Sequence, residues 1–313
     1  MAKVQGRFRS TCEYAGAMAG YFLLAWLPLP VSKAIATVLA DVWRIADKRH
    51  RMLAVSQTMD RLDIGRPEAE RLVKANYRHY GLAFLEVARL KRMSLSEIRS
   101  RTDINGCDAV LKDALAEGNG LIVLTGHLGN WEWGAVTLGM LDVVEGLIAR
   151  PLDNPYLDRF IRDIRQRTGA VVWDKFGSMR KALAAVRGGK GFVAVIDQDG
   201  GRKGSMAPFL GKDGSTMASP IEMAIRTGAP LFVGAMVRTG GACTFTMIGK
   251  RVHRPRPDAD AEEEKTRLLT EINEDLSEII RDYPEQWIWI HRRWKTTITK
   301  IIPKNSRSRR VRR

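Results

Sequence analysis

The sequence predicts an α/β protein with a central, largely parallel mixed sheet flanked by helices and preceded by a helical N-terminal region. Between residues 121 and 248, short apolar, β-branched runs alternate with segments of helical period. In the first third of the chain, apolar residues recur instead at helical spacing. The chain has 313 residues, of which 45% are hydrophobic and 27% charged. This is a globular composition, and a chain of this length can bury a large core without disulfides.

Residues 1–100 are expected to form a membrane-associated helical region. An uncharged run, 14–31, follows three basic residues and contains 18 residues. That length is borderline for crossing a bilayer, so we interpret the run as a membrane anchor or an interfacial helix, with an ordinary buried helix as the alternative. Helices are also predicted over 33–60 and from Pro67 to about Arg92, the second with proline at its first position.

Residues 101–300 are expected to form the α/β domain. Strands are predicted at 121–125, 146–149, 170–173, 191–196, 231–237 and 244–248. Helices are predicted after Asn130 and at 156–167, 178–187 and 262–283, with a capping box at Ser219–Glu222 opening another. Repeated βα units predict a parallel sheet, and in such sheets sites form beyond the carboxyl ends of the strands.

The strand at 121–125 is followed by Gly-His-Leu-Gly-Asn-Trp-Glu, which places His127 and Glu132 five residues apart. On a straight helix these positions are about 140° apart, so the two side chains converge only if His127 lies in the turn and Glu132 in the first helical turn. Gly126 and Gly129 allow such a turn. A carboxylate partner orients an imidazole and raises its basicity. The pattern therefore predicts a general base that acts on a hydroxyl, the alternative being a structural turn histidine.

Other catalytic patterns are absent from this stretch. The sequence contains no complete GxGxxG, HExxH or GxSxG motif there. The motif also contains no Ser or Cys, which favours direct transfer over a covalent acyl-enzyme. The three cysteines are far apart, which argues against a disulfide framework and a CxxC metal site. We therefore expect neither a metal nor another cofactor.

Two further segments carry candidate functional residues. Asp197 and Asp199 follow the strand at 191–196 and precede two glycines, a pattern that also suits an Asx turn or a metal-binding Asp-x-Asp pair. Arg150 precedes a predicted helix that ends near Arg165 and Arg167. Such arginines could stabilise an oxyanion or hold a phosphate, although arginines on a helix are more often simply solvated.

The charge balance indicates an anionic partner. The chain has 51 Lys and Arg against 35 Asp and Glu, a net charge of +16, and ten of the basic residues lie after residue 291. Residues 301–313 are interpreted as a solvated basic tail, which is either disordered or contacts anionic lipid headgroups. No helix-turn-helix, RNA-binding signature or zinc finger accompanies the tail, so nucleic acid is not the expected partner. Nearby tryptophans suit a membrane interface or a core, and Arg292 and Arg293 could bind phosphate.

The motif from Gly126 to Glu132 resembles the His-x4-Asp/Glu motif of glycerolipid acyltransferases. The longer pattern resembles the lipid A late acyltransferase family, the lauroyl and myristoyl transferases of lipopolysaccharide synthesis. Supporting segments run in family order from about residue 15 to 296. They are Arg150-Pro-x-Asp-Asn-Pro, Arg165-x-Arg167, Asp197-Gln-Asp199, Phe209-Leu-Gly211 and Pro284-Glu-Gln-Trp-Ile-Trp-x-His-Arg-Arg-Trp294.

The resemblance implies transfer of an acyl chain from acyl carrier protein, or from a coenzyme A thioester, to a hydroxyl of a phosphorylated glycolipid at the cytoplasmic face of the inner membrane. It implies that His127 is the general base and Glu132 its partner, and that Arg165 and Asp197 are the other catalytic residues. The substrate-binding residues it suggests are Asn130, Arg150, Arg167, Asp199, Arg292 and Arg293.

The acceptor is less defined, because the family's early Asn-Leu is replaced by Ser56-Gln-Thr-Met59. A lipid A precursor is the expected acceptor, with a phosphatidylinositol mannoside or a lysophospholipid as alternatives. Outside this reaction, the alternatives are a metal-dependent glycosyltransferase and a non-catalytic binder of anionic lipid or nucleic acid.

Overall fold

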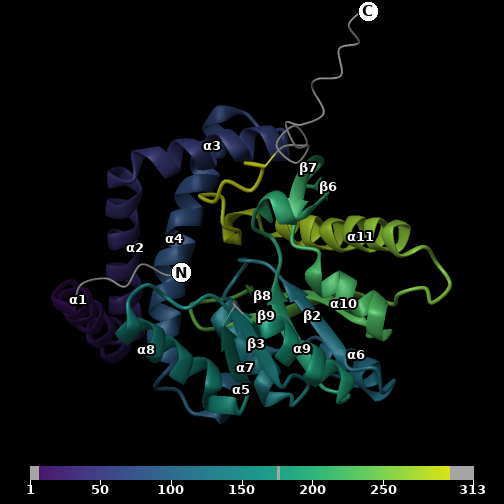
Figure 1. Cartoon of the computed structure of the whole chain (residues 1–313). Coiled ribbons are helices and arrows are strands. Elements are labelled where there is room, and N and C mark those ends of the chain that lie inside the picture. The colour runs from purple at the N-terminus through teal and green to yellow at the C-terminus, as the bar shows by residue number, and fades with distance from the viewer. Residues whose placement is uncertain (1–6, 175–176, 297–313) are drawn as a thin grey trace, which may run out of the picture.

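A seven-stranded sheet forms the centre of the fold (Figure 1). The computed structural model describes residues 7–174 and 177–296. In sheet order the strands are β1 (Thr102–Asp103), β9 (Phe245–His253), β8 (Leu231–Arg238), β2 (Leu121–Thr125), β5 (Gly191–Val195), β3 (Gly146–Ala149) and β4 (Val171–Asp174). The five strands from β8 to β4 are mutually parallel, whereas β9 runs antiparallel to β8. The predicted α/β class with a largely parallel mixed sheet is confirmed.

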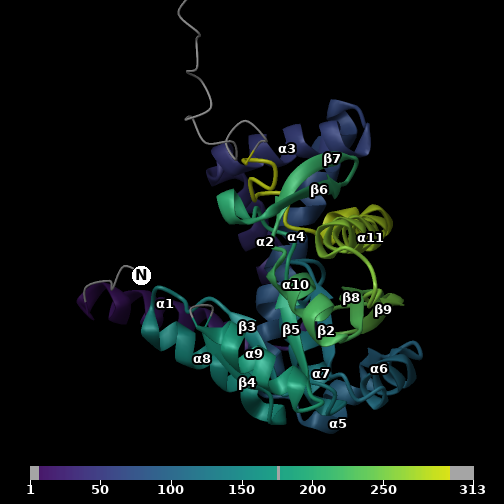
Figure 2. The same cartoon turned by 45° about the vertical axis from the view of Figure 1, so that its right-hand side comes forward.

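Helices cover both faces of the sheet, because each central strand is apolar on both sides and needs two layers to bury it. Side chains of α5 (Leu95–Ser100), α6 (Cys107–Ala116), α7 (Trp131–Met140) and α8 (Pro155–Arg165) share one core with the odd-numbered residues of β2. Side chains of α9 (Ser178–Arg187), α10 (Ser219–Thr227) and α11 (Ala261–Asp282) share the other core with its even-numbered residues. Figure 2 shows these layers from a second direction.

Among the described residues, the helices that precede α5 and the first strand are α1 (Arg7–Trp26), α2 (Leu29–Ala46), α3 (Lys48–Leu62) and α4 (Arg66–Leu90). The single helix predicted over 33–60 is wrong, because the chain breaks at Asp47. There the backbone leaves the helical region, and the Asp47 carboxylate accepts a hydrogen bond from the His50 backbone N–H, capping α3. Within the described residues, no helix combines the length and hydropathy that a bilayer crossing requires.

Several local features were not predicted from the sequence. They are α5, α6, β1 and the hairpin of β6 (Ser205–Phe209) and β7 (Lys212–Thr216), which packs against α11. The predicted capping box at Ser219 does not form, because Ser219 is already helical and the N-cap position belongs to Ala218. The basic tail predicted for residues 301–313 lies outside the described residues.

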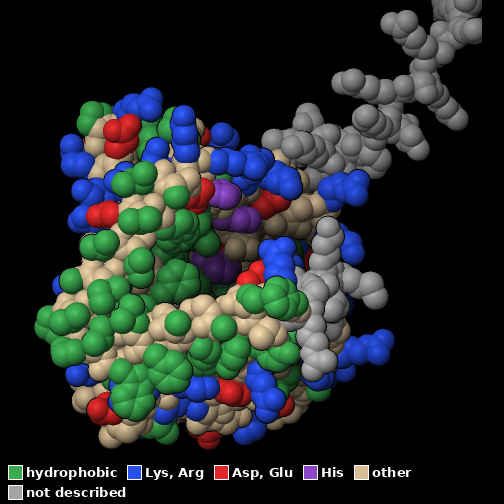
Figure 3. Space-filling view, turned by 90° about the vertical axis from the view of Figure 1, so that its left-hand side faces the viewer, with side chains coloured by type: hydrophobic (Ala, Val, Ile, Leu, Met, Phe, Trp, Pro, Cys, Tyr) green, Lys and Arg blue, Asp and Glu red, His purple; other side chains and the backbone are tan. Residues whose placement is uncertain are grey.

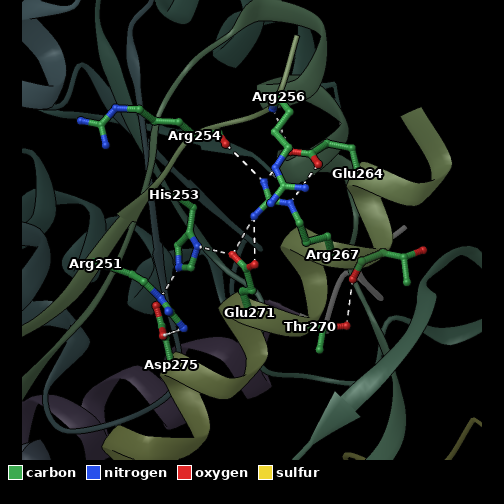
Figure 4. A network of polar contacts seen from close by, with 10 residues as sticks. Arg251, His253, Arg254, Arg256, Glu264, Arg267, Thr270, Glu271 and Asp275 are labelled. Atoms are coloured by element: carbon green, nitrogen blue, oxygen red, sulfur yellow. Dashed lines mark hydrogen bonds and ion pairs between the residues drawn. The ribbon is translucent and has the colours of Figure 1, made fainter. Parts of the chain in front are cut away.

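A polar network fastens the end of β9 to α11 (Figure 4). His253 is buried, and its Nδ1 and Nε2 lie 3.0 Å from Glu271 and 2.7 Å from Asp275. Arg267 lies between Glu264 and Glu271, each about one helical turn away from it, and donates to both. Since every charged group in this cluster faces an opposite charge, we interpret the network as structural.

Candidate active site

His127 and Asp197 meet at the carboxyl ends of two adjacent parallel strands. His127 lies in the loop between β2 and α7, and Asp197 follows β5, which pairs directly with β2. The Nδ1 atom of His127 lies 2.8 Å from Oδ1 of Asp197, and the His127 backbone N–H donates to Oδ2 at 2.6 Å. The indole N–H of Trp287 donates to the same Oδ2 at 2.8 Å. Three donors therefore fix the buried Asp197 carboxylate, which in turn orients the imidazole.

This arrangement raises the basicity of His127. Burial by itself lowers the pKa of His127, but the charge and hydrogen bond of Asp197 act in the opposite direction and hold the pKa above its ordinary value of 6.5. Burial raises the pKa of Asp197, and the attraction of His127 with the donors around the carboxylate outweighs it and lowers the pKa. Asp197 therefore stays ionised. The pair uses the Nδ1 atom of His127, so the Nε2 atom is available to bind a substrate group.

The carboxylate that pairs with His127 is that of Asp197, whereas the sequence analysis expected Glu132. Glu132, in the first turn of α7, forms a two-pronged ion pair with Arg165 of α8, with Nε and Nη2 of Arg165 2.6 and 2.5 Å from its oxygens. Burial lowers the pKa of Arg165, but Glu132 outweighs it and raises the pKa. Glu132 turns toward α8 because α7 packs on that helix, whereas the adjacent strand end places Asp197 against His127.

A cavity of about 600 Å³ opens beside these residues. Its lining includes His127, Glu132 and Arg165, and below them two rows of side chains that cross the sheet. The upper row is Ala149, Val195, Thr125 and Gly234, and the lower row is Leu147, Val193, Val123 and Phe232. The rows are two residues apart along each strand, so the lower row lies about 6–7 Å deeper. The cavity therefore combines a charged mouth with an apolar interior.

The face of the protein that carries α1, α2 and α8 is hollowed (Figure 3). Histidine side chains are visible within the hollow, hydrophobic side chains gather beside and below it, and Lys and Arg side chains lie along its upper side.

Three residues that were expected to bind substrate make hydrogen bonds within the protein. Asn130 is buried, caps α7 through the Trp133 backbone N–H and donates to Glu86. Arg167 donates to the carbonyls of Leu90 and Met93, at the end of α4. Arg293 is fully buried and donates to the Ser215 carbonyl and the Thr216 hydroxyl. Their hydrogen-bonding groups are directed into the protein, which a linear motif cannot indicate.

Of the other three expected residues, Arg150 and Arg292 are exposed and Asp199 is half-buried. Arg150 lines the cavity and forms an exposed ion pair with Asp153. Asp199 also lines the cavity, and its carboxylate accepts from the hydroxyl of Thr296 at 2.9 Å. Arg292 is exposed and does not line the cavity. In residues 7–174 and 177–296, no three His, Cys, Asp or Glu side chains come close enough together to hold a metal ion.

The sequence analysis did not predict that α4 supports the loop that carries His127. His79 lies 3.2 Å from the Gly129 carbonyl, and the Tyr80 hydroxyl donates to the His127 carbonyl at 3.4 Å. The buried Glu86 forms a two-pronged ion pair with Arg238 of β8, at 2.5 and 2.6 Å. The sequence indicates this support only through Glu86, a glutamate within the apolar stripe of a predicted helix. Trp287 is one of the tryptophans for which the sequence analysis left a membrane interface and a core position open. It is fully buried in the core.

The loop that carries His127 requires glycine at position 129. Its φ is +63°, and a Cβ atom there would lie 1.9 Å from the Met236 carbonyl oxygen. We expect Gly129→Ala to lower the free energy of unfolding by at least about 3 kcal/mol, because the strained backbone and the clash add. In the matched control Gly134→Ala, the new Cβ meets only Met236 Cβ at 3.4 Å, and helix propensity favours the change. Equal unfolding midpoints of the two variants in urea would contradict this requirement.

The fold and this site describe an α/β protein with a histidine–aspartate pair at a strand end beside an apolar cavity. A family model described as bacterial lipid A biosynthesis acyltransferase matches residues 2–296, and the chain belongs to this family.

Curated relatives agree with this assignment. The lipid A biosynthesis palmitoleoyltransferase of Escherichia coli K12 is 26% identical over 282 residues, covering 88% of both chains. The lipid A biosynthesis lauroyltransferase of the same organism is 24% identical over 280 residues, covering 88% of this chain and 89% of the relative. A phosphatidylinositol mannoside acyltransferase of Mycolicibacterium smegmatis is 25% identical over 239 residues, covering 74% of this chain and 76% of the relative.

Proposed function

We propose that this acyltransferase moves a fatty acyl chain from a thioester, carried by acyl carrier protein, to a hydroxyl of a phosphorylated glycolipid, a lipid A precursor. The observation that carries the proposal is the His127–Asp197 pair at the mouth of an apolar cavity. A general base must reach the reacting hydroxyl, and the acyl chain needs an apolar site out of water.

In the proposed reaction, Nδ1–H of His127 donates to Asp197 and the free Nε2 accepts the proton of the acceptor hydroxyl. The hydroxyl oxygen bonds to the thioester carbonyl carbon, and the carbonyl oxygen becomes an oxyanion. When this intermediate collapses, the carbon–sulfur bond breaks and the leaving thiolate takes the proton from Nε2. The products are an ester and a free thiol, and His127 returns to its neutral form.

Arg165 is the group that we assign to the oxyanion. Glu132 engages its Nε and Nη2 atoms, so the guanidinium is held in one orientation at the cavity. A fixed cation that faces developing negative charge in a partly buried site stabilises the transition state more than a mobile one. Glu132 then acts as a positioning residue through Arg165.

The two rows of residues across the sheet, which are largely apolar, are the proposed acyl-chain site. Ala135 of α7 lines the same cavity opposite the sheet. We expect Ala135→Leu to shift the preferred donor toward chains at least two carbons shorter, because each methylene that loses its site forfeits about 0.8 kcal/mol. The measurement is kcat/KM for a series of acyl thioesters, with Ala135→Ser as the near-isosteric control. An unchanged chain-length profile in a folded Ala135→Leu variant would contradict this assignment.

The membrane surface is the proposed working location. Helices α1 and α2 expose large apolar side chains, namely Phe22, Leu23, Trp26, Val31, Val38, Leu39, Val42 and Ile45. Figure 3 shows hydrophobic side chains on the face where the hollow opens. Contiguous exposed apolar surface of this kind suits an interfacial site, and a lipid acceptor then reaches the cavity without leaving the membrane.

Mass spectrometry of lipids from cells with and without the protein tests the reaction and the acceptor together, with the His127→Ala protein as the inactive control. We expect one lipid A species to gain one acyl chain only when the active protein is made. The phosphatidylinositol mannoside relative motivates one alternative, in which lipid A is unchanged and another glycolipid is acylated. No change in any lipid, with the protein confirmed to be present, would overturn the proposal.

A further inference from the structure

A second cavity, of about 180 Å³, lies where the end of α1 meets the end of α4. None of its lining residues lines the cavity that contains His127. Three of them are arginines: Arg89 and Arg92 from the end of α4, and Arg101 just after α5. The one carboxylate in the lining is Glu97, which caps α5 by accepting from the Ser94 backbone N–H at 2.7 Å. The lining therefore carries an excess of two positive charges.

Contacts within the protein account for only part of this arginine cluster. Arg89 donates through Nη2 to the Leu27 carbonyl, and Arg92 donates through Nη1 to the Ala25 carbonyl, so both secure the end of α1. The Nε atom of Arg89 is buried and has no hydrogen-bond partner. No hydrogen bond or ion pair of the Arg101 guanidinium is found within the described residues. Arg92 and Arg101 are exposed, so the buried donor that lacks an acceptor is the Nε atom of Arg89. Buried donors normally have acceptors, so an anionic group that enters the cavity would complete this site.

We propose that this second cavity binds a phosphate group. Guanidinium groups match the oxygens of phosphate in geometry and charge, and several arginines around one cavity are the usual means of holding it. The Arg92 guanidinium also lies 3.7 Å from the ring centre of Trp26, whose side chain is 62% exposed. Tryptophan prefers the headgroup level of membranes, which makes the headgroup of an anionic phospholipid the favoured source of the phosphate. Free phosphate is the other source.

Two variants of the full chain separate this site from general charge attraction. Arg101→Gln removes an exposed charge that lines the cavity and that, within the described part of the chain, forms no side-chain hydrogen bond or ion pair. Arg99→Gln removes the same charge two residues away, from an exposed side chain that does not line the cavity. In the first experiment, the proteins are titrated with vesicles of equimolar phosphatidylcholine and phosphatidylglycerol. In the second, their thermal unfolding is compared in inorganic phosphate and in chloride at equal ionic strength.

For a headgroup site, Arg101→Gln weakens vesicle binding by roughly 10- to 100-fold, the value of one charge-assisted hydrogen bond. Arg99→Gln weakens it by about fivefold at most, the value of one charge near an anionic surface. For a free-phosphate site, the two variants bind vesicles alike, but phosphate raises the unfolding temperature of the wild type and Arg99→Gln and not of Arg101→Gln. Identical behaviour of the two variants in both experiments would overturn the proposal. Neither experiment requires acyltransferase activity. A failure of the phosphate-site proposal can therefore be distinguished from a failure of the proposed reaction.

Discussion

Replacement of His127 by alanine is expected to lower kcat by about 10⁴-fold, the upper range of what a general base contributes. The KM for the acyl thioester should change little, because the apolar rows of the cavity are untouched. Loss of the imidazole leaves the buried Asp197 with two donors, the His127 backbone N–H and the Trp287 indole, so the fold should persist. Single-turnover kinetics and thermal unfolding of the same preparation measure both effects.

A second histidine provides the matched control for this variant. His50 also pairs with an aspartate, its Nδ1 lying 2.7 Å from Asp47, but it is exposed and lies outside the cavity. His50→Ala should retain the wild-type rate. Retained turnover in a well-folded His127→Ala variant would exclude His127 as the base.

Asp197→Asn is expected to lower kcat by roughly 10³- to 10⁴-fold through the tautomer of His127. Oδ2 of Asp197 accepts two N–H donors, so an asparagine must place its oxygen there and its NH₂ toward Nδ1 of His127. Nδ1 then has to accept a hydrogen bond, and the ring proton moves to Nε2. An Nε2 atom that carries a proton cannot remove one from the acceptor, which is the effect of the same change in serine protease triads.

The pH dependence of the rate provides an independent readout. A general base works in its neutral form, so the wild-type rate should rise with pH through the pKa of His127, which Asp197 holds above 6.5 against the effect of burial. In Asp197→Asn the rising part of the pH profile should move to lower pH, because the negative charge that raises the pKa of His127 is gone. Glu132→Gln should move it less, since Glu132 acts on His127 only through a weaker, longer-range attraction. An Asp197→Asn variant with the wild-type rate and profile would refute the pairing.

Local pattern was sufficient to predict most of the elements. The strand at 121–125 and the helix at 178–187 have the bounds expected from the sequence, because apolar period and flanking glycines act over a few residues. The position of His127 at a strand end follows from the same pattern. The break at Asp47 was missed because Asp47 was not identified as a helix cap, whereas in the structure its carboxylate caps α3 through the His50 backbone N–H.

The sequence alone thus determined the alternation of strands and helices, the candidate base and the family resemblance. Only the tertiary structure decided which charges face one another. Asp197 lies 70 residues from His127 and becomes its partner because β5 pairs with β2, while Glu132, five residues away, turns to Arg165. Arg293, which a motif suggests as a phosphate ligand, is buried against Ser215 and Thr216. The physical reason is that the apolar period depends on residues close together in the sequence. The partner of an ionised side chain depends instead on which strands and helices become neighbours on folding.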